Sequence, residues 1–136
     1  MIMNESLPDK KSVGRAGEDI ACRFLESKGY KILDRNFWKP WGEIDIIAER
    51  NGAVRFIEVK AVSHKVSSSI SREIDYRPEA LVDTRKLRKL AKTAALYMQQ
   101  KKDEREFQID VVGVILDRDK KVAKCRLFEQ ALEDNL

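Results

Sequence analysis

Two apolar segments of this sequence are joined by Asn51-Gly52, the strongest short signal for a two-residue β-hairpin turn. Such a turn fixes the register of the two strands, and counting outward from it sets Asp45 directly opposite Glu58. By the same count, Glu43 falls opposite Lys60. Strand side chains alternate with a period of two, so these four side chains are expected on one face of the sheet.

Two carboxylates at paired strand positions have Cβ atoms roughly 4.5–5.5 Å apart and repel each other. A divalent cation between Asp45 and Glu58 turns that repulsion into binding, and Lys60 adds a positive charge on the same face. Two acids and a lysine around one metal ion and one phosphate are the chemistry of a nuclease. The alternative is two separately solvated acids on a polar sheet face.

The residues next to these acids favour the functional interpretation. Both strands are apolar on either side of the acids, as in strands buried on both faces. The apolar neighbours are Ile44, Ile46, Ile47, Phe56, Ile57 and Val59. An unpaired charge in such a strand is costly, so acids there are rarely present for solubility.

Composition restricts the class of protein. With 136 residues, 43% of them hydrophobic and 37% charged, the chain is expected to be soluble and globular. Its longest apolar run, Val111–Leu116, is too short to cross a bilayer, and the N-terminal residues do not resemble a secretory signal. Cys22 and Cys125 have neither disulfide-framework nor zinc spacing, which fits a reducing cytoplasm. We therefore expect a cytoplasmic protein.

Positive charge is concentrated in one segment of a chain whose net charge is +4. Residues 85–92 contain five basic side chains and no acid: Arg85, Lys86, Arg88, Lys89 and Lys92. A basic cluster on one element is typical of nucleic-acid binding. The alternative is a solvated helix face.

The first helix is predicted over residues 12–28, with Gly29 as the residue that ends it. Glu18 lies at the edge of its apolar arc, so its carboxylate is expected to reach across the inner surface of the domain. The alternative for Glu18 is a first-turn acid matched to the helix dipole.

The other elements follow from periodicity and turn residues. A strand is predicted at 30–37, followed by a loop at 38–42, the hairpin, a helix from Asp83 or Thr84 to about Gln100, and strands at 107–116 and 122–128. The order αβββαββ predicts an α/β fold in which helices pack on a mixed β-sheet. Polar residues 63–78, including His64, are predicted to form a long flexible connection.

One nuclease-like domain is expected over residues 12–130, between a flexible N-terminus at 1–11 and a C-terminal tail at 131–136.

Several short motifs occur in a fixed order along the chain. They are Gly14-x-x-Gly17-Glu18, Gly29-Tyr30, Asn36, Gly42-Glu43-Ile44-Asp45-Ile46-Ile47, Phe56-Ile57-Glu58-Val59-Lys60, Lys86 and Asp110-Val111-Val112. Over about residues 12–128, this set resembles the YraN-like family (uncharacterised protein family 0102). These small bacterial proteins are predicted endonucleases related to archaeal Holliday-junction resolvases.

The resemblance implies a restriction-endonuclease-like core with an active site built from an acid of the first helix and a D…(D/E)-x-K motif. On that resemblance, the catalytic positions are Glu18, Asp45, Glu58 and Lys60. Members of the family commonly follow the E-V-K motif with a small residue and an arginine. Here Ala61-Val62-Ser63 follows instead, which puts substrate affinity or preference in question.

These residues predict a site for Mg²⁺ or Mn²⁺. Asp45, Glu58 and the backbone carbonyl of Val59 are the expected ligands, because magnesium takes one or two carboxylates and keeps several waters. Glu18 is expected to orient the attacking water or help to bind a second ion. Such a site hydrolyses phosphodiester bonds.

Lys60 is expected to position the attacking water or to stabilise the transition state, with Glu43 paired to it as a supporting residue. The basic helix is expected to contact phosphates without reading bases. The predicted function is structure-directed endonuclease action on branched or junction DNA, as in repair or recombination, and the resolvase resemblance implies a homodimer. The alternatives are a catalytically inactive nucleic-acid-binding module and a protein-interaction subunit that docks an acidic partner.

Overall fold

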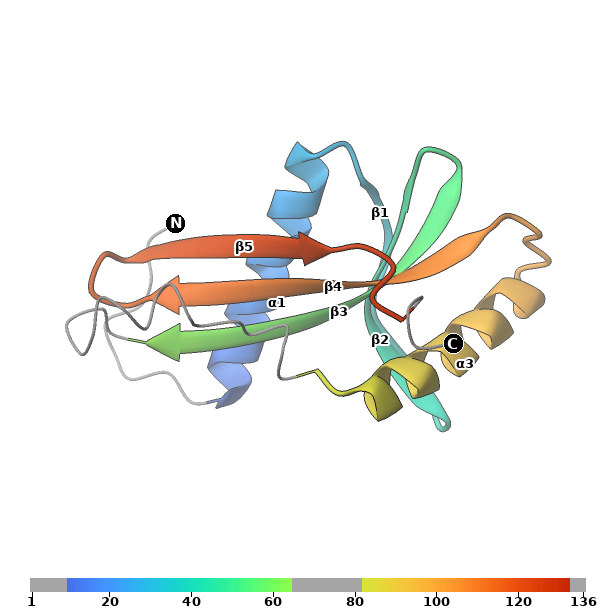
Figure 1. Cartoon of the computed structure of the whole chain (residues 1–136), viewed down its shortest axis with the longest axis horizontal. Helices are drawn as coiled ribbons and strands as arrows, with labels where there is room; N and C mark the ends of the chain where they lie inside the picture. Colours follow the sequence, from blue (N-terminus) through green and yellow to red (C-terminus); the bar gives the residue numbers. More distant parts are fainter. Residues whose placement is uncertain (1–9, 65–81, 133–136) are drawn as a thin grey trace.

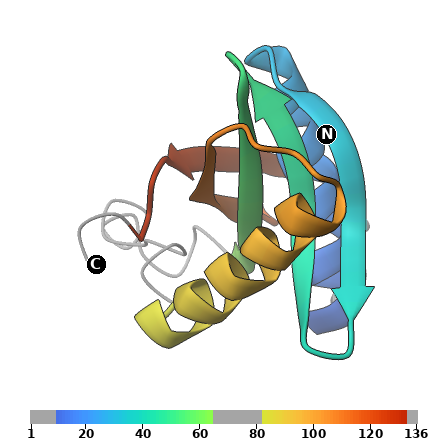
Figure 2. The ribbon, with the colours of Figure 1, turned by 90° about the vertical axis from the view of Figure 1, so that its right-hand side faces the viewer.

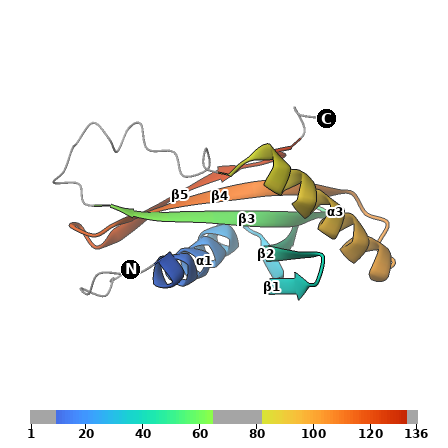
Figure 3. The same cartoon turned by 90° about the horizontal axis from the view of Figure 1, so that it is seen from below.

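A five-stranded sheet carries α1 on one face and α3 on the other in the part of the chain that this computed structural model describes, residues 10–64 and 82–132 (Figure 1, Figure 3). The elements are α1 (Lys10–Ser27), β1 (Lys31–Lys39), β2 (Gly42–Arg50), β3 (Ala53–His64), α3 (Thr84–Gln100), β4 (Phe107–Asp117) and β5 (Val122–Phe128). The strands lie side by side in chain order; β3 and β4 are parallel and the other neighbours antiparallel. The predicted order and the mixed sheet flanked by helices are confirmed.

Apolar side chains fill a layer on each face of the sheet. Ile57 packs beneath α1 and its neighbour Phe56 packs beneath α3, and both are fully buried. The prediction that the hairpin strands are buried on both faces is therefore confirmed. A Cβ atom on Gly17 would lie 2.2 Å from the Cβ of Ala61, so α1 lies very close to β3. This close approach brings the next residue, Glu18, toward the sheet.

The hairpin turn follows the prediction. Asn51 and Gly52 both have positive φ, 52° and 78°, as a type I′ turn requires. The ladder then continues from Arg50↔Ala53 in the expected register.

The predicted end of the first helix and the predicted start of the second are both confirmed. Gly29 has φ +89° after α1, in the left-handed region that glycine adopts without a Cβ penalty. At α3, the Asp83 Oδ1 accepts a 2.7 Å hydrogen bond from the backbone N–H of Lys86, which makes Asp83 the N-cap. Because α1 begins at Lys10, Glu18 lies well past its first turn. The helix-dipole explanation for Glu18 is therefore wrong.

Two predicted loop boundaries are wrong. The segment 38–42 is the tip of a second hairpin, because β1 continues to Lys39 and only Pro40-Trp41 connects it to β2 (Figure 2). The predicted connection 63–78 begins inside β3, where Ser63 and His64 pair with β4. The rest of that connection, from residue 65, lies outside the described residues.

The chain beyond β5 packs back on the sheet. The backbone N–H of Ala131 donates a 2.8 Å hydrogen bond to the carbonyl of Ile109, and Leu132 is buried beneath α3. The packed region therefore reaches Leu132, just past the predicted domain end. Among the helices of the described segments, none is long and apolar enough to span a membrane.

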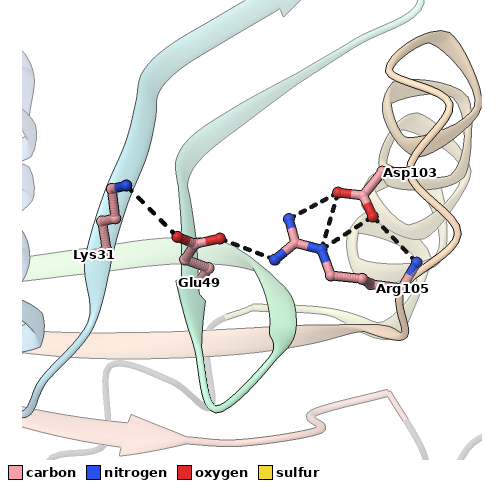
Figure 4. A network of polar contacts seen from close by, with 4 residues as sticks. All are labelled: Lys31, Glu49, Asp103 and Arg105. Atoms are coloured by element: carbon pink, nitrogen blue, oxygen red, sulfur yellow. Dashed lines mark hydrogen bonds and ion pairs between the residues drawn. The ribbon is translucent and has the colours of Figure 1, made fainter.

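A surface network connects β1, β2 and the segment after α3 (Figure 4). Glu49 pairs with Lys31 at 3.8 Å and with Arg105 at 2.9 Å, and Arg105 also pairs with Asp103 at 2.8 Å. Exposed ion pairs of this kind contribute little to stability. They connect the segment after α3 to β1 and β2.

Candidate active site

The candidate site lies where β2 and β3 stop pairing. The ladder ends at Ile46↔Ile57, and beyond it the two strands run apart (Figure 1). Asp45 comes next on β2, and its Oδ2 accepts a 2.8 Å hydrogen bond from the backbone N–H of Val59. The predicted cross-strand pairing of Asp45 with Glu58 is therefore not part of the ladder, because the Asp45 side chain takes the place of a backbone partner.

An unusual backbone conformation in β1 lies next to this position. Asn36 lies across from Asp45 and has φ +53°, a left-handed conformation that is uncommon outside glycine. Ile44 packs beneath α3 and Ile46 beneath α1, although strict alternation would put residues two apart on the same face. The expectation that all four charged side chains share one face is therefore wrong at Asp45.

The structure nevertheless brings Asp45 and Glu58 together. Only 8% of the Glu58 side chain is exposed. Burial, and then the charge of Asp45, raise the pKa of Glu58 from 4.5 to about 7. Burial likewise raises the pKa of Asp45, against the opposing effects of the Val59 N–H, the Lys86 charge and a hydrogen bond to Glu58. Two adjacent buried carboxylates thus resist carrying two negative charges.

A lysine from α3 supplies the nearest positive charge. The Nζ of Lys86 lies 2.6 Å from Oε1 of Glu58, and slightly more than half of the Lys86 side chain is exposed. Lys86 and Lys89 line a cavity of about 240 Å³ together with Glu43 and Glu58. Glu43 raises the pKa of both Asp45 and Glu58, so three carboxylates act on one another here.

Lys60 does not make the contact that was predicted for it. It follows Glu58 by two residues and shares its face by alternation. Within the described segments, however, no hydrogen bond or ion pair joins Lys60 to Glu43, Asp45 or Glu58. The predicted Glu43–Lys60 pair is therefore not formed, and Lys86 is the lysine in contact with the acids. The sequence marked Lys86 only as one member of the basic cluster.

Glu18 approaches Asp45 from the other side of the sheet. It lines an open hollow with Asp45 and Arg35, and 12% of its side chain is exposed. Burial, followed by the charge of Asp45, raises the pKa of Glu18, while Arg35 lowers it. The Nε of Arg35 lies 3.3 Å from Glu18, and its Nη2 lies 2.6 Å from Asp19. No local pattern in the sequence marks Arg35, because its position opposite α1 depends on the packing of β1.

The donor set fits a magnesium-type ion with several waters. In the described residues, no three His, Cys, Asp or Glu side chains are arranged to hold a metal ion. Asp45 and Glu58 nevertheless offer two adjacent carboxylates whose repulsion a cation would relieve. In a β-strand, the N–H and the C=O of one residue point toward the same neighbouring strand. The Val59 N–H points toward Asp45 of β2, so the Val59 carbonyl also points toward β2. Two carboxylates and one carbonyl leave positions for water, which magnesium retains.

The basic cluster on α3 divides into two rows. Lys86 and Lys89, three residues apart, face the acid-lined cavity. Arg85, Arg88 and Lys92 follow a second row at helical spacing, and all three are exposed. The predicted set therefore does not act as one unit: Lys86 contacts Glu58 and Lys89 lines the same cavity, whereas the three residues of the second row do not line it.

Comparison with known proteins places the chain in a family. The sequence model of Uncharacterised protein family UPF0102 matches residues 17–114, which include Glu18, Asp45, Glu58, Lys60 and Lys86. This chain belongs to that family. A UPF0102 protein of Campylobacter hominis is 41% identical over 101 residues, covering 74% of this chain and 81% of the relative. The UPF0102 protein of Thermotoga maritima is 40% identical over 100 residues, covering 74% of this chain and 83% of the relative.

A third UPF0102 protein, from Thermotoga neapolitana, is 42% identical over 100 residues, with 74% and 84% of the two chains covered. The family resemblance predicted from the motifs is thus confirmed.

Proposed function

We propose that this UPF0102 protein is a Mg²⁺- or Mn²⁺-dependent endonuclease that hydrolyses phosphodiester bonds in DNA, preferring branched or junction substrates. The observation that supports this most is the pair of buried, mutually repelling carboxylates Asp45 and Glu58 at the point where two strands separate. A structural ion pair would not need two acids. Strongly perturbed pKa values of neighbouring acids in a cleft are typical of functional sites.

Each residue of the site has its own role in this proposal. Asp45, fixed by the Val59 N–H, and Glu58 hold the ion together with the Val59 carbonyl. The ion, when bound, stabilises charge on the scissile phosphate and lowers the pKa of the attacking water. Glu18, on the far side of Asp45, orients that water. Lys60, which shares the Glu58 face, stabilises the phosphate in the transition state.

The phosphate backbone is bound by α3. Lys86 and Lys89 line the cavity that contains Glu58, so a phosphate entering it meets two ammonium groups. Arg85 and Lys92, on the outward row, extend the positive surface along the helix. Contacts of this kind position the nucleic acid without reading its sequence, which is why we propose structure-directed binding.

The Lys86–Glu58 ion pair favours a second candidate function. An ammonium group that already neutralises Glu58 is compatible with a nuclease-fold module that binds nucleic acid without cleaving it. The two candidates differ in their response to divalent ions, which only the hydrolase requires.

Cleavage of a labelled four-way DNA junction by wild type and Asp45→Asn, with Mg²⁺, Mn²⁺ or chelator, tests the proposal. The hydrolase requires metal-dependent cleavage by wild type and none by Asp45→Asn. Binding without cleavage by wild type under every metal condition, on junction, flap and linear DNA, would instead support the binding module.

A further inference from the structure

The two tryptophans of this chain, Trp38 and Trp41, lie at the tip of the β1–β2 hairpin. Trp38 is 66% exposed and Trp41 is 45% exposed, and Trp38 is the most exposed large apolar side chain of the described residues. Neither belongs to the apolar layers on the two faces of the sheet. Two neighbouring large aromatic side chains in solvent call for an explanation other than folding, because burial would stabilise them.

The tip is held firmly at its base. A Cβ atom on Gly42 would lie 2.2 Å from Oγ1 of Thr93, so the start of β2 lies against α3. The ring of Phe37 packs edge-to-face on Tyr97, with centroids 5.2 Å apart. Pro40 occupies the turn itself and restricts its backbone. The indoles are therefore displayed from a fixed support, and little conformational freedom is lost when they bind a ligand.

The surroundings of the tip combine aromatic and cationic groups. Trp38 and Lys39 line the same cavity as Lys86 and Lys89 of α3. Indole faces bind nucleobases of any sequence by stacking, and lysines bind the phosphates that connect them. Each nucleotide of a nucleic acid carries one base and one phosphate, so a single chain can contact the indoles and the lysines together. An apolar peptide or a lipid tail would contact the indoles and leave the lysines unused.

We propose that Trp38 and Trp41 form a stacking platform for an unpaired nucleobase and hold a single strand or branch point beside the acid-lined cavity. The inference rests on the proposed nucleic-acid substrate and names its reactive region as unpaired. A base inside a duplex has both faces covered by its neighbours, so the platform distinguishes unpaired from paired nucleic acid. The resulting preference is for structure and not for sequence.

Tryptophan fluorescence, excited selectively over tyrosine, tests the proposal directly, because both tryptophans lie at the tip. Wild type is titrated, in chelator so that nothing is cleaved, with oligo-dT and with a blunt duplex of equal length. The platform requires strong quenching by the single strand and weak quenching by the duplex. Saturating binding of oligo-dT that leaves the fluorescence of both tryptophans unchanged would overturn it.

Affinities of variants provide the second readout. Stacking energies per base predict that Trp38→Ala or Trp41→Ala weakens binding of oligo-dT by about tenfold. Duplex affinity should change less than twofold, and Trp38→Phe should retain most of the single-strand affinity. Val122→Ala is the matched control, since Val122 is an exposed apolar residue at the start of β5, far from the tip (Figure 1).

Each of the other possible results would also support or overturn the stacking platform. Unchanged single-strand affinity in both alanine variants, or equal losses on duplex and single strand, would overturn the platform. A fluorescence change with anionic vesicles but not with oligo-dT would mean that the tip binds a membrane surface, and would also overturn the platform. If the tryptophans stack on single-stranded DNA but the protein never cleaves DNA, the platform is supported and the endonuclease proposal is refuted. The two proposals can therefore be tested separately.

Discussion

Replacing Glu58 with glutamine should stabilise the metal-free protein, although it removes an ion pair. Folding raises the pKa of Glu58 from 4.5 to about 7, because burial and Asp45 disfavour its charged form more than Lys86 favours it. The folded state therefore binds a proton more tightly than the unfolded state. At 1.36 kcal/mol per pKa unit, forcing Glu58 to ionise costs the folded state about 3 kcal/mol.

The sign of this effect sets its pH window. A carboxylate with a raised folded pKa contributes its full stability below pH 4.5, and that stability is lost as pH rises through about 7. Glutamine resembles the protonated acid in shape and charge at every pH. Glu58→Gln should thus exceed wild type by only about 1 kcal/mol at pH 5 and by up to about 3 kcal/mol at pH 8.

Urea unfolding in chelator, at pH 5 and pH 8, measures this difference. Glu104→Gln, which removes an exposed carboxylate after α3, is the control and should differ little from wild type at either pH. Adding Mg²⁺ at pH 8 should then stabilise wild type and not Glu58→Gln, because a ligand that binds only the folded state stabilises that state. A Glu58→Gln variant that is less stable than wild type at pH 8 would refute the argument, since Lys86 would then outweigh the repulsion.

Three further outcomes are expected. Mg²⁺ or Mn²⁺ should raise the melting temperature of wild type and not of Asp45→Asn; equal shifts in differential scanning calorimetry would remove Asp45 from the site. Lys60→Ala should abolish cleavage of a junction with little loss of affinity, because one charge at the scissile phosphate acts mainly in the transition state; parallel losses in binding isotherms would contradict this role. Replacing Arg85, Arg88 and Lys92 with glutamate should weaken binding to all DNA substrates. The slope of log affinity against log salt concentration should fall by close to one unit per lost phosphate contact. An unchanged slope would mean that these three side chains are only a solvated face of the helix.

Local signals in the sequence predicted much of the fold. Asn51-Gly52 has few conformations other than a tight hairpin turn, and Gly29 and Asp83 mark helix ends for equally local reasons. Apolar residues on both sides of the acids predicted strands with two buried faces, as Phe56 and Ile57 show. These features depend on a few neighbouring residues, so a single sequence is sufficient.

The details of the candidate site depend on tertiary packing and were not predictable in the same way. Alternation fails at Asp45, since Ile44 and Ile46 pack on opposite faces of the sheet, and Asn36 on the neighbouring strand has a left-handed conformation. Lys86 contacts Glu58 because α3 lies across β2 and β3. The hairpin register suggested instead that Lys60 pairs with Glu43 across the two strands, an inference that needs no knowledge of where a helix packs.

The contact between Lys86 and Glu58 offsets only part of the cost of placing two acids together. A lysine 2.6 Å away lowers the pKa of Glu58, yet the pKa still lies near 7. The ammonium group therefore offsets only part of the cost of burial and of the Asp45 charge. Lys86 is also more than half exposed, and ion pairs with exposed lysines are weak. A cation that bonds directly to both carboxylates would offset more of this cost, and Lys86 would then be released to bind phosphate in the same cavity.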